Sequence, residues 1–118
     1  MTEGEVILTP IPQANGLIKN RPAVFLREMP PYRDLLVCGV STQLHQQVKG
    51  FDETIASGDA DFVASGLLAD SIIRLDFLAV LPRNKIVGSI GAISRERHER
   101  LLITLSSHLT ANLTGQIP

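Results

Sequence analysis

The chain has 118 residues, of which 44% are hydrophobic and 19% charged, so its composition excludes a disordered protein and suits one buried core. Its formal net charge of −1 argues against a strongly basic nucleic-acid-binding domain. Every apolar run is far shorter than the roughly 20 residues that cross a bilayer, which excludes a transmembrane helix and a membrane partner. We expect one domain covering residues 1–118.

The first residues and the cysteine count bear on compartment and cofactors. The start from Met1 to Glu5 is acidic, unlike the basic start of a secretory signal, so the cytoplasm is the expected location. Cys38 is the sole cysteine and the three histidines are scattered, so neither a disulfide nor a zinc-type ligand set is predicted. We expect no metal and no other cofactor. Cys38 lies in an apolar segment and is interpreted as a small core side chain.

The negative charge is concentrated in one segment. Residues 51–70 carry five acidic side chains and no Lys or Arg, whereas the segments on either side carry a small basic excess. The five are Asp52, Glu53, Asp59, Asp61 and Asp70. We interpret the segment as a solvated acidic loop without a role of its own, turned away from any ligand, so that the rest of the surface is mildly basic.

Several short apolar, β-favouring segments predict strands. In chain order these are residues 6–8, 22–26, 34–40, 51–55, 71–80 and 85–90. Pro10 and Pro12 should end the first strand, because proline donates no ladder hydrogen bond. A polar loop is expected over residues 13–20, which places Arg21 at the start of the second strand. The third, nearly continuous in apolar residues, reads as a central strand buried on both faces, and a short helical turn is possible within 43–50.

A C-terminal helix is predicted from about residue 95 to residue 111. Ser94 suits its N-cap, with Glu96 and Glu99 near the positive end of the helix dipole. An apolar stripe then recurs at spacings of three and four, formed by His98, Leu101, Leu102, Leu105, Leu109 and Leu113. The expected fold class is mainly β with a C-terminal helix (α+β): a small, partly closed antiparallel barrel with the helix packed against it.

Five short motifs occur in a characteristic order along the chain. They are residues 4–12 (GEVILTPIP), 19–26 (KNRPAVFL), 40–43 (VSTQ), 71–75 (SIIRL) and 90–94 (IGAIS). Together they resemble the MazF/PemK family of toxin endoribonucleases, and the resemblance covers nearly the whole chain. The chain departs from the family at Ile11, where an aromatic residue is usual, and at residues 13–15, which lack the loop's common acidic residue.

The resemblance implies a barrel of the MazF/PemK/CcdB type and a toxin that cleaves single-stranded RNA without a metal. It further implies a homodimer with the RNA groove at or near the subunit interface, and a cognate antitoxin whose tail occupies that groove. Two alternatives stay open. One is a CcdB-like toxin that binds DNA gyrase, and the other is a non-catalytic interaction barrel. The absence of tryptophan and the non-aromatic C-terminus argue against the first.

The proposed chemistry suits two side chains, which the resemblance implies as the catalytic pair. RNA can be cut when its own 2′-hydroxyl attacks the adjacent phosphate, provided that donors point at the phosphorane oxygens. Arg21 can bind these oxygens bidentately, and Ser41 can donate a further hydrogen bond. The structural alternative for Arg21 is a surface salt bridge to Glu5 or Glu28, and for Ser41 a hydroxyl that closes a strand end.

Further polar residues flank this pair in sequence and are candidate contacts to phosphates or to bases of an unpaired strand. They are Asn15, Lys19, Asn20, Thr42, Gln43, His45, Gln46 and Lys49. Ordinary loop polarity is the alternative for each. The unperturbed pKa of His45 would suit a proton carrier, although an exposed or RNA-stacking role fits it better. His98 and His108 are interpreted as packing or surface residues of the helix.

Overall fold

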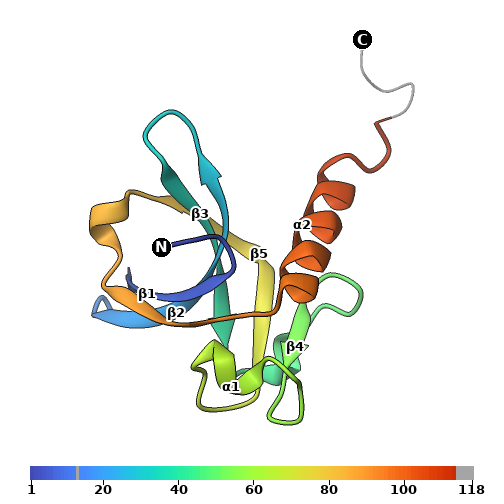
Figure 1. Cartoon of the computed structure of the whole chain (residues 1–118), viewed down its shortest axis with the longest axis horizontal. Coiled ribbons are helices and arrows are strands. Elements are labelled where there is room, and N and C mark those ends of the chain that lie inside the picture. The colour runs from blue at the N-terminus through green and yellow to red at the C-terminus, as the bar shows by residue number, and fades with distance from the viewer. Residues whose placement is uncertain (13, 114–118) are drawn as a thin grey trace.

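The computed structural model describes residues 1–12 and 14–113, with Ile11 and Pro12 described in backbone only (Figure 1). Within these residues, six strands form one antiparallel sheet in the order β4-β5-β3-β2-β1-β6. The strands are β1 (Glu5–Pro12), β2 (Ile18–Met29), β3 (Asp34–Ser41), β4 (Glu53–Ile55), β5 (Ser71–Leu81) and β6 (Gly88–Ala92). The helices are η1 (Leu44–Gln46), α1 (Phe62–Ser65), η2 (Arg83–Lys85) and α2 (Arg95–Leu109).

The sheet curls into a partly closed barrel, and α2 packs against its outside (Figure 1). Alternate residues of a strand face opposite sides of a sheet, and the two hydrophobic clusters follow this rule. Val6 and Val24 join Leu101 and Leu105 of α2 in one cluster, whereas their neighbours enter the other. That second cluster contains Ile7, Ala23, Phe25, Leu35 and Val37. The predicted fold class is therefore confirmed, with β3 in the interior of the sheet.

The prediction that prolines end the first strand was wrong. β1 continues through Pro10 and Pro12, which pair with Asn20 and Ile18 of β2. The carbonyl of Leu8 accepts the N–H of Val87 at 2.8 Å, on the β6 side of the strand. Pro10 and Pro12 lie two and four residues after Leu8, so their backbone nitrogens face the same side of the strand. Both lie beyond Leu8, where the pairing with β6 ends. Proline is tolerated at these two positions because β6 does not pair with this part of β1, so no backbone N–H is needed there.

The predicted polar loop was also too long. Residues 18–20 belong to β2, so Arg21 is the fourth residue of the strand and pairs with Thr9 rather than starting the strand. The hairpin turn is confined to a few residues around Asn15, whose side chain accepts the N–H of Leu17 at 3.1 Å. Strand pairing extended the element because β1 itself continues to Pro12.

Helix α2 begins where predicted. Ser94 accepts the N–H of Arg97 at 3.1 Å, which makes it the N-cap. Leu101 and Leu105 are buried, but Leu109 is 65% exposed, so the C-terminal half of the predicted stripe does not reach the core. The short helix α1 was not predicted, since four residues give no periodicity to detect.

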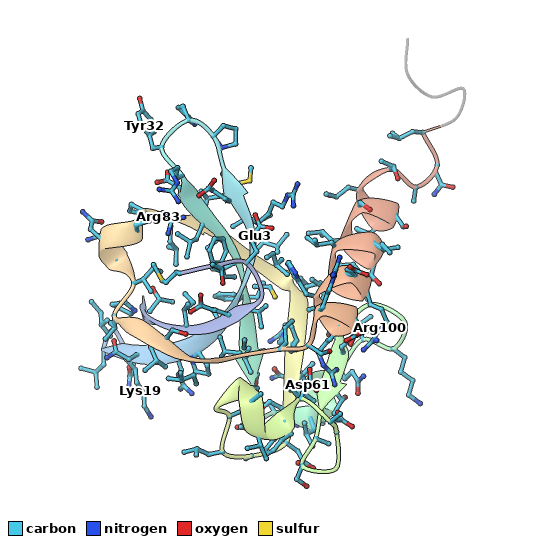
Figure 2. The ribbon with its side chains drawn as sticks, in the orientation of Figure 1. Glu3, Lys19, Tyr32, Asp61, Arg83 and Arg100 are labelled. Carbon is cyan, nitrogen blue, oxygen red and sulfur yellow. The ribbon has the colours of Figure 1, made fainter. Side chains whose placement is uncertain are left out.

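The acidic segment is not a solvated loop. Arg97, whose side chain is 8% exposed, donates bidentately to Asp61 at 2.8 and 3.1 Å and also reaches Glu53 and Asp59, each at 3.0 Å. Asp61 additionally accepts the N–H of Ser94 at 3.0 Å. Figure 2 shows Asp61 near the first turn of α2, with Arg100 on the flank of the helix, where it pairs with Glu53. This cluster, the Arg97 clamp, ties residues 53–61 to α2.

Acidification tests the Arg97 clamp. Hydrogen bonding from Arg97 lowers the pKa of Asp61 from 3.8 to about 2. A carboxyl group whose pKa is lower in the folded state stabilises the fold above its unfolded pKa and loses this contribution as pH falls through the folded value. We expect the free energy of unfolding to lose about 2 kcal/mol from this group between about pH 5 and about pH 2.

Urea unfolding at several pH values measures the effect. Asp61→Asn should flatten the acid dependence by that amount, whereas Asp70→Asn, at an exposed carboxylate, should leave it nearly unchanged. Equal slopes for the parent and Asp61→Asn would contradict the assignment.

Candidate functional site

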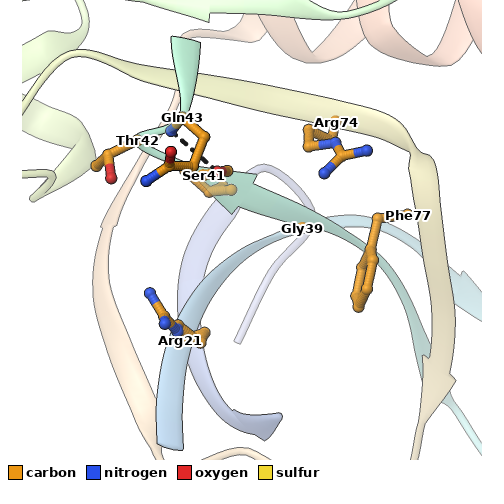
Figure 3. A pocket seen from close by; sticks show the side chains of 8 residues that line it. Arg21, Gly39, Ser41, Thr42, Gln43, Arg74 and Phe77 are labelled. Carbon is orange, nitrogen blue, oxygen red and sulfur yellow. Dashed lines mark hydrogen bonds between the residues drawn. The ribbon is translucent and has the colours of Figure 1, made fainter. Parts of the chain in front are cut away.

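The pairing of β2 with β3 brings Arg21 and Ser41 together. The ladder between the two strands ends at the pair of Ala23 with Gly39, and Arg21 and Ser41 each lie two residues beyond that pair on their own strand. Residues two apart share a face, so both side chains face the inner side of the curl, as Ala23 does. In Figure 3 the Arg21 side chain points toward the end of β3 that carries Ser41. The two residues predicted from sequence as a pair thus lie at one opening of the barrel.

A cavity of about 230 Å³ occupies this opening. Its lining comes from β2, β3, β5 and the residues after β3: Arg21, Gly39, Val40, Ser41, Thr42, Gln43, Arg74 and Phe77. The Oγ of Ser41 accepts the N–H of Gln43 at 3.1 Å, which leaves the Ser41 hydroxyl proton to be donated elsewhere. The cavity therefore has a cation, a hydroxyl donor and an aromatic ring on its walls.

A second cavity of about 380 Å³ shares Arg21, Val40, Ser41 and Thr42 with the first. Its other walls are mostly apolar and come from β1, β2, β5, β6 and the segment after α1: Leu8, Pro22, Gly66, Leu67, Leu68, Ala69, Ser71 and Ile90. Arg21 and Ser41 therefore stand between a polar cavity and an apolar one.

Arg74 and Phe77 were missed by the sequence analysis. The register between β3 and β5 changes at this point: Cys38 pairs with Leu78, but the next residue, Gly39, pairs with Arg74. Residues 75–77 therefore form a bulge in β5, and bulges beside sites redirect side chains. The break in apolar alternation at residues 75–78 was the available signal, but sequence alone gives no reason to place it beside Ser41.

Asp52 holds this bulge in place. Its carboxylate is buried, with 5% exposure, and accepts the N–H of Leu75 at 3.1 Å and that of Val48 at 2.9 Å. The Leu75 N–H lies in the bulge, outside the β3 ladder, and would otherwise be buried without this acceptor. One side chain of the acidic segment thus fixes both the bulge and the loop that follows η1.

Arg74 is fixed by its neighbours. Asp76 accepts from its Nε and Nη2 at 3.1 and 2.8 Å, and the Oε1 of Gln46 accepts from its Nη1 at 3.0 Å. The hydrogen bonds to Asp76 raise the pKa of Arg74 and lower that of Asp76, so both stay charged at neutral pH. Gln46, predicted as an RNA contact, is therefore also a support for Arg74.

The other predicted contacts are distributed unevenly. Thr42 and Gln43 line the first cavity, and His45 lies exposed nearby in chain order, in η1. Asn15, Lys19 and Asn20 are exposed on the β1–β2 hairpin, where Figure 2 marks Lys19. Lys49 does not belong with them: it lines a separate cavity with Phe51 and His108.

The remaining polar candidates have structural roles. Glu28, one of the expected salt-bridge partners of Arg21, is bonded by Arg33 and Arg83, each at 2.8 Å. Burial raises the pKa of the Cys38 thiol to about 12, in agreement with its predicted place in the core. His98 is half-buried, with its Nε2 2.7 Å from the carbonyl of Leu26.

Two further features of the described residues bear on ligands. No group of three or more His, Cys, Asp or Glu side chains in residues 1–12 and 14–113 is placed to share a metal ion. Over the same part of the chain, no helix is both long and apolar enough to span a bilayer.

The curled antiparallel sheet with its C-terminal helix is a MazF-like toxin fold, as a comparison with solved structures shows. The structure of Mycobacterium tuberculosis toxin MazF-mt6 is similar, with a TM-score of 0.66 and 16% identity over 89% of this chain and 95% of that one. A comparison with curated proteins gave no match.

A match to a protein-family model shows the family of this chain. The model described as PemK-like, MazF-like toxin of type II toxin-antitoxin system matches residues 2–109. The chain belongs to this family.

Removal of the Asp52 carboxylate tests its role in the bulge. Asp52→Ala leaves two backbone N–H groups without their acceptor, so we expect a loss of about 1–3 kcal/mol in the free energy of unfolding. The amide of Leu75 should exchange faster with solvent in the variant. Denaturant unfolding and amide hydrogen exchange measure the two effects.

Asp70→Ala is the matched control. Asp70 also accepts a backbone N–H, that of Ser57 at 2.9 Å, but at an exposed site, so its loss should cost much less. Equal losses in the two variants would show that Asp52 has no special role in the bulge.

Proposed function

We propose that this toxin-family chain is an endoribonuclease that cleaves single-stranded RNA without a metal. The observation that carries the proposal is that Arg21 and Ser41 line the walls of the same two cavities. A planar, permanently charged guanidinium beside a hydroxyl donor suits the non-bridging oxygens of a phosphate. Family membership supports the same reading, since MazF-like toxins typically cleave RNA.

The reaction needs no outside nucleophile. The 2′-hydroxyl of the RNA loses its proton and its oxygen forms a bond to the adjacent phosphorus, while the bond from phosphorus to the 5′-oxygen breaks. The products are a 2′,3′-cyclic phosphate and a 5′-hydroxyl, which takes up a proton. Arg21 and Ser41 stabilise the negative charge that develops on the phosphorane oxygens, and they hold the phosphate in line.

Partners follow from the same proposal. An RNA strand passing Arg21 would extend into both cavities, with Thr42 and Gln43 beside it in the first. Asn15, Lys19, Asn20 and His45 are exposed and available to a longer strand. The chain would act as a homodimer in the cytoplasm, restrained by a cognate antitoxin whose tail covers the RNA groove. Lys49 is assigned no contact with the scissile region, because it lines a different cavity.

Substitution of Arg21 is the direct test of the mechanism. Arg21→Ala should lower the single-turnover cleavage rate by about 100-fold or more, the scale seen when one preorganised donor is lost. Arg21→Lys should fail nearly as badly, because an ammonium cannot present the bidentate fork. Ser41→Ala should lose less, and the double variant should lose less than the product of the single losses if both donors serve one phosphate.

Arg95→Ala is the control for a general loss of positive charge, since Arg95 is 87% exposed at the start of α2 and pairs with Glu99. It should cleave like the parent. Thermal unfolding should differ by only a few degrees among the parent, Arg21→Ala, Arg21→Lys and Arg95→Ala, because exposed side chains contribute little to stability. Full activity in Arg21→Ala would overturn the catalytic assignment.

Chelation tests the proposed independence from metals. Because the nucleophile is the RNA's own hydroxyl and Arg21 supplies the stabilising charge, cleavage of a long unstructured RNA should persist with EDTA present. Activity abolished by EDTA and restored by magnesium would contradict the mechanism. Inhibition of gyrase supercoiling without any RNA cleavage would instead favour a CcdB-like toxin.

A further inference from the structure

An exposed aromatic ring stands beside the proposed catalytic pair. Phe77 is 46% exposed, although it is a large apolar residue within the bulge of β5. It lines the same cavity as Arg21 and Ser41, and Figure 3 shows it projecting from β5 into that opening. The Phe77 ring is partly exposed to solvent and lies beside Arg21, the proposed phosphate-binding cation. A ligand with an aromatic face would fit this position.

The position of the Phe77 ring is fixed by its packing. A Cβ atom at Gly39 would lie 2.9 Å from Cδ1 and 3.3 Å from Cγ of Phe77, so the ring packs directly against the backbone of β3. The bulge in β5 brings it there, and Asp52 holds that bulge through the Leu75 N–H. Because its position is set by backbone contacts, little ordering remains to be done when a ligand binds.

Arg74 provides hydrogen-bond donors near this ring. Its guanidinium carries five N–H groups. Among the contacts of the described residues, Asp76 and Gln46 engage three of them. The Arg74 side chain is 28% exposed and also lines the cavity, so its remaining donors can meet acceptors of a ligand there. The cavity thus combines a stacking surface with a rigid donor group.

We infer that Phe77 and Arg74 form a nucleobase subsite. An unpaired base of a nucleotide next to the phosphate at Arg21 stacks on Phe77, and Arg74 donates to acceptors on the edge of that base. Base stacking on an aromatic side chain is a main source of affinity for single strands. This inference rests on the proposed function, because it places the phosphate of an RNA strand at Arg21.

A second copy of the chain is the other partner that this ring could meet, since Leu78 and Val80 of β5 are also exposed, at 41% and 52%. The base is favoured because Phe77 lines a cavity with two arginines and hydroxyl groups, whereas Leu78 and Val80 do not line it. A cationic cavity suits a nucleotide better than an apolar interface.

The experiment measures RNA binding separately from cleavage. The probe is a pool of short, unstructured 2′-O-methyl RNAs, which have no attacking hydroxyl, followed by fluorescence anisotropy. Phe77→Ala should weaken binding about 10-fold, on the scale of one lost base stack. Phe77→Tyr, which keeps the ring, should bind like the parent. Tyr32→Ala removes another exposed aromatic residue, 81% exposed at the tip of the β2–β3 hairpin, and should also bind like the parent (Figure 2).

A second arm identifies the base. Once the cut position is mapped on a long RNA, 2′-O-methyl probes of the mapped sequence are made abasic at either flanking nucleotide. One of these two abasic probes should bind the parent and Phe77→Ala with equal affinity, because it lacks the base that stacks on Phe77. Sedimentation of each variant reports the oligomeric state.

The outcomes separate the two proposals. A parent that binds the pool through Phe77 but cuts no RNA overturns the endoribonuclease and keeps the base subsite. Equal binding by the parent and Phe77→Ala overturns the subsite whether or not RNA is cut. A Phe77→Ala variant that changes from dimer to monomer with unchanged RNA affinity assigns the ring to a second copy of the chain and also overturns the subsite.

Discussion

The arrangement of the proposed site depends on one buried carboxylate. Asp52 accepts the N–H of Leu75 and thereby stabilises the bulge that β5 makes against β3. If the ladder continued regularly from the pair of Cys38 with Leu78, Gly39 would lie opposite Phe77 instead of Arg74, and Arg74 would be displaced along the strand. The backbone distortion thus sets which side chains of β5 reach the cavity beside Ser41. The Asp52 carboxylate stabilises the bulge because it accepts a hydrogen bond from the Leu75 N–H, which would otherwise be buried without a partner.

Two arginines that differ in burial, Arg97 and Arg21, explain how a chain of net charge −1 keeps a cation on a cavity wall. Arg97 is 8% exposed and is surrounded by Glu53, Asp59 and Asp61. Much of the acidic charge of residues 51–70 is therefore neutralised within the Arg97 clamp or directed at backbone N–H groups, as in Asp52. Arg21 is exposed at the cavity, where the local field matters more than the formal sum. Net charge was a weak guide here because the acids are already paired within the fold.

Sequence reasoning succeeded where the determinants are local. The N-cap at Ser94 follows from the residue type, the buried positions Leu101 and Leu105 follow from their spacing, and β3 follows from its continuous apolar run. It failed where the determinant lies far along the chain. The partners of Arg97 are 36 to 44 residues away in sequence. The five acidic residues of segment 51–70 were therefore interpreted as a solvated loop. The family motif predicted Arg21 and Ser41 as the catalytic pair, but the bulge that places Arg74 and Phe77 in the same cavity depends on a carboxylate 23 residues from Leu75.

The second cavity is bounded by an equally constrained element. Gly66 ends α1 with φ of +75°, and a Cβ atom there would lie 2.0 Å from the carbonyl oxygen of Ile90 in β6. The chain after α1 can therefore approach β6 only because this residue has no side chain, and Leu67 to Ala69 follow at once as walls of the apolar cavity. Backbone contacts thus fix the walls on both sides of Arg21, at Gly39 and at Gly66. On the mechanism proposed above, a phosphate between two such walls would meet donors that need little rearrangement, which is the condition under which electrostatic stabilisation of a transition state is most effective.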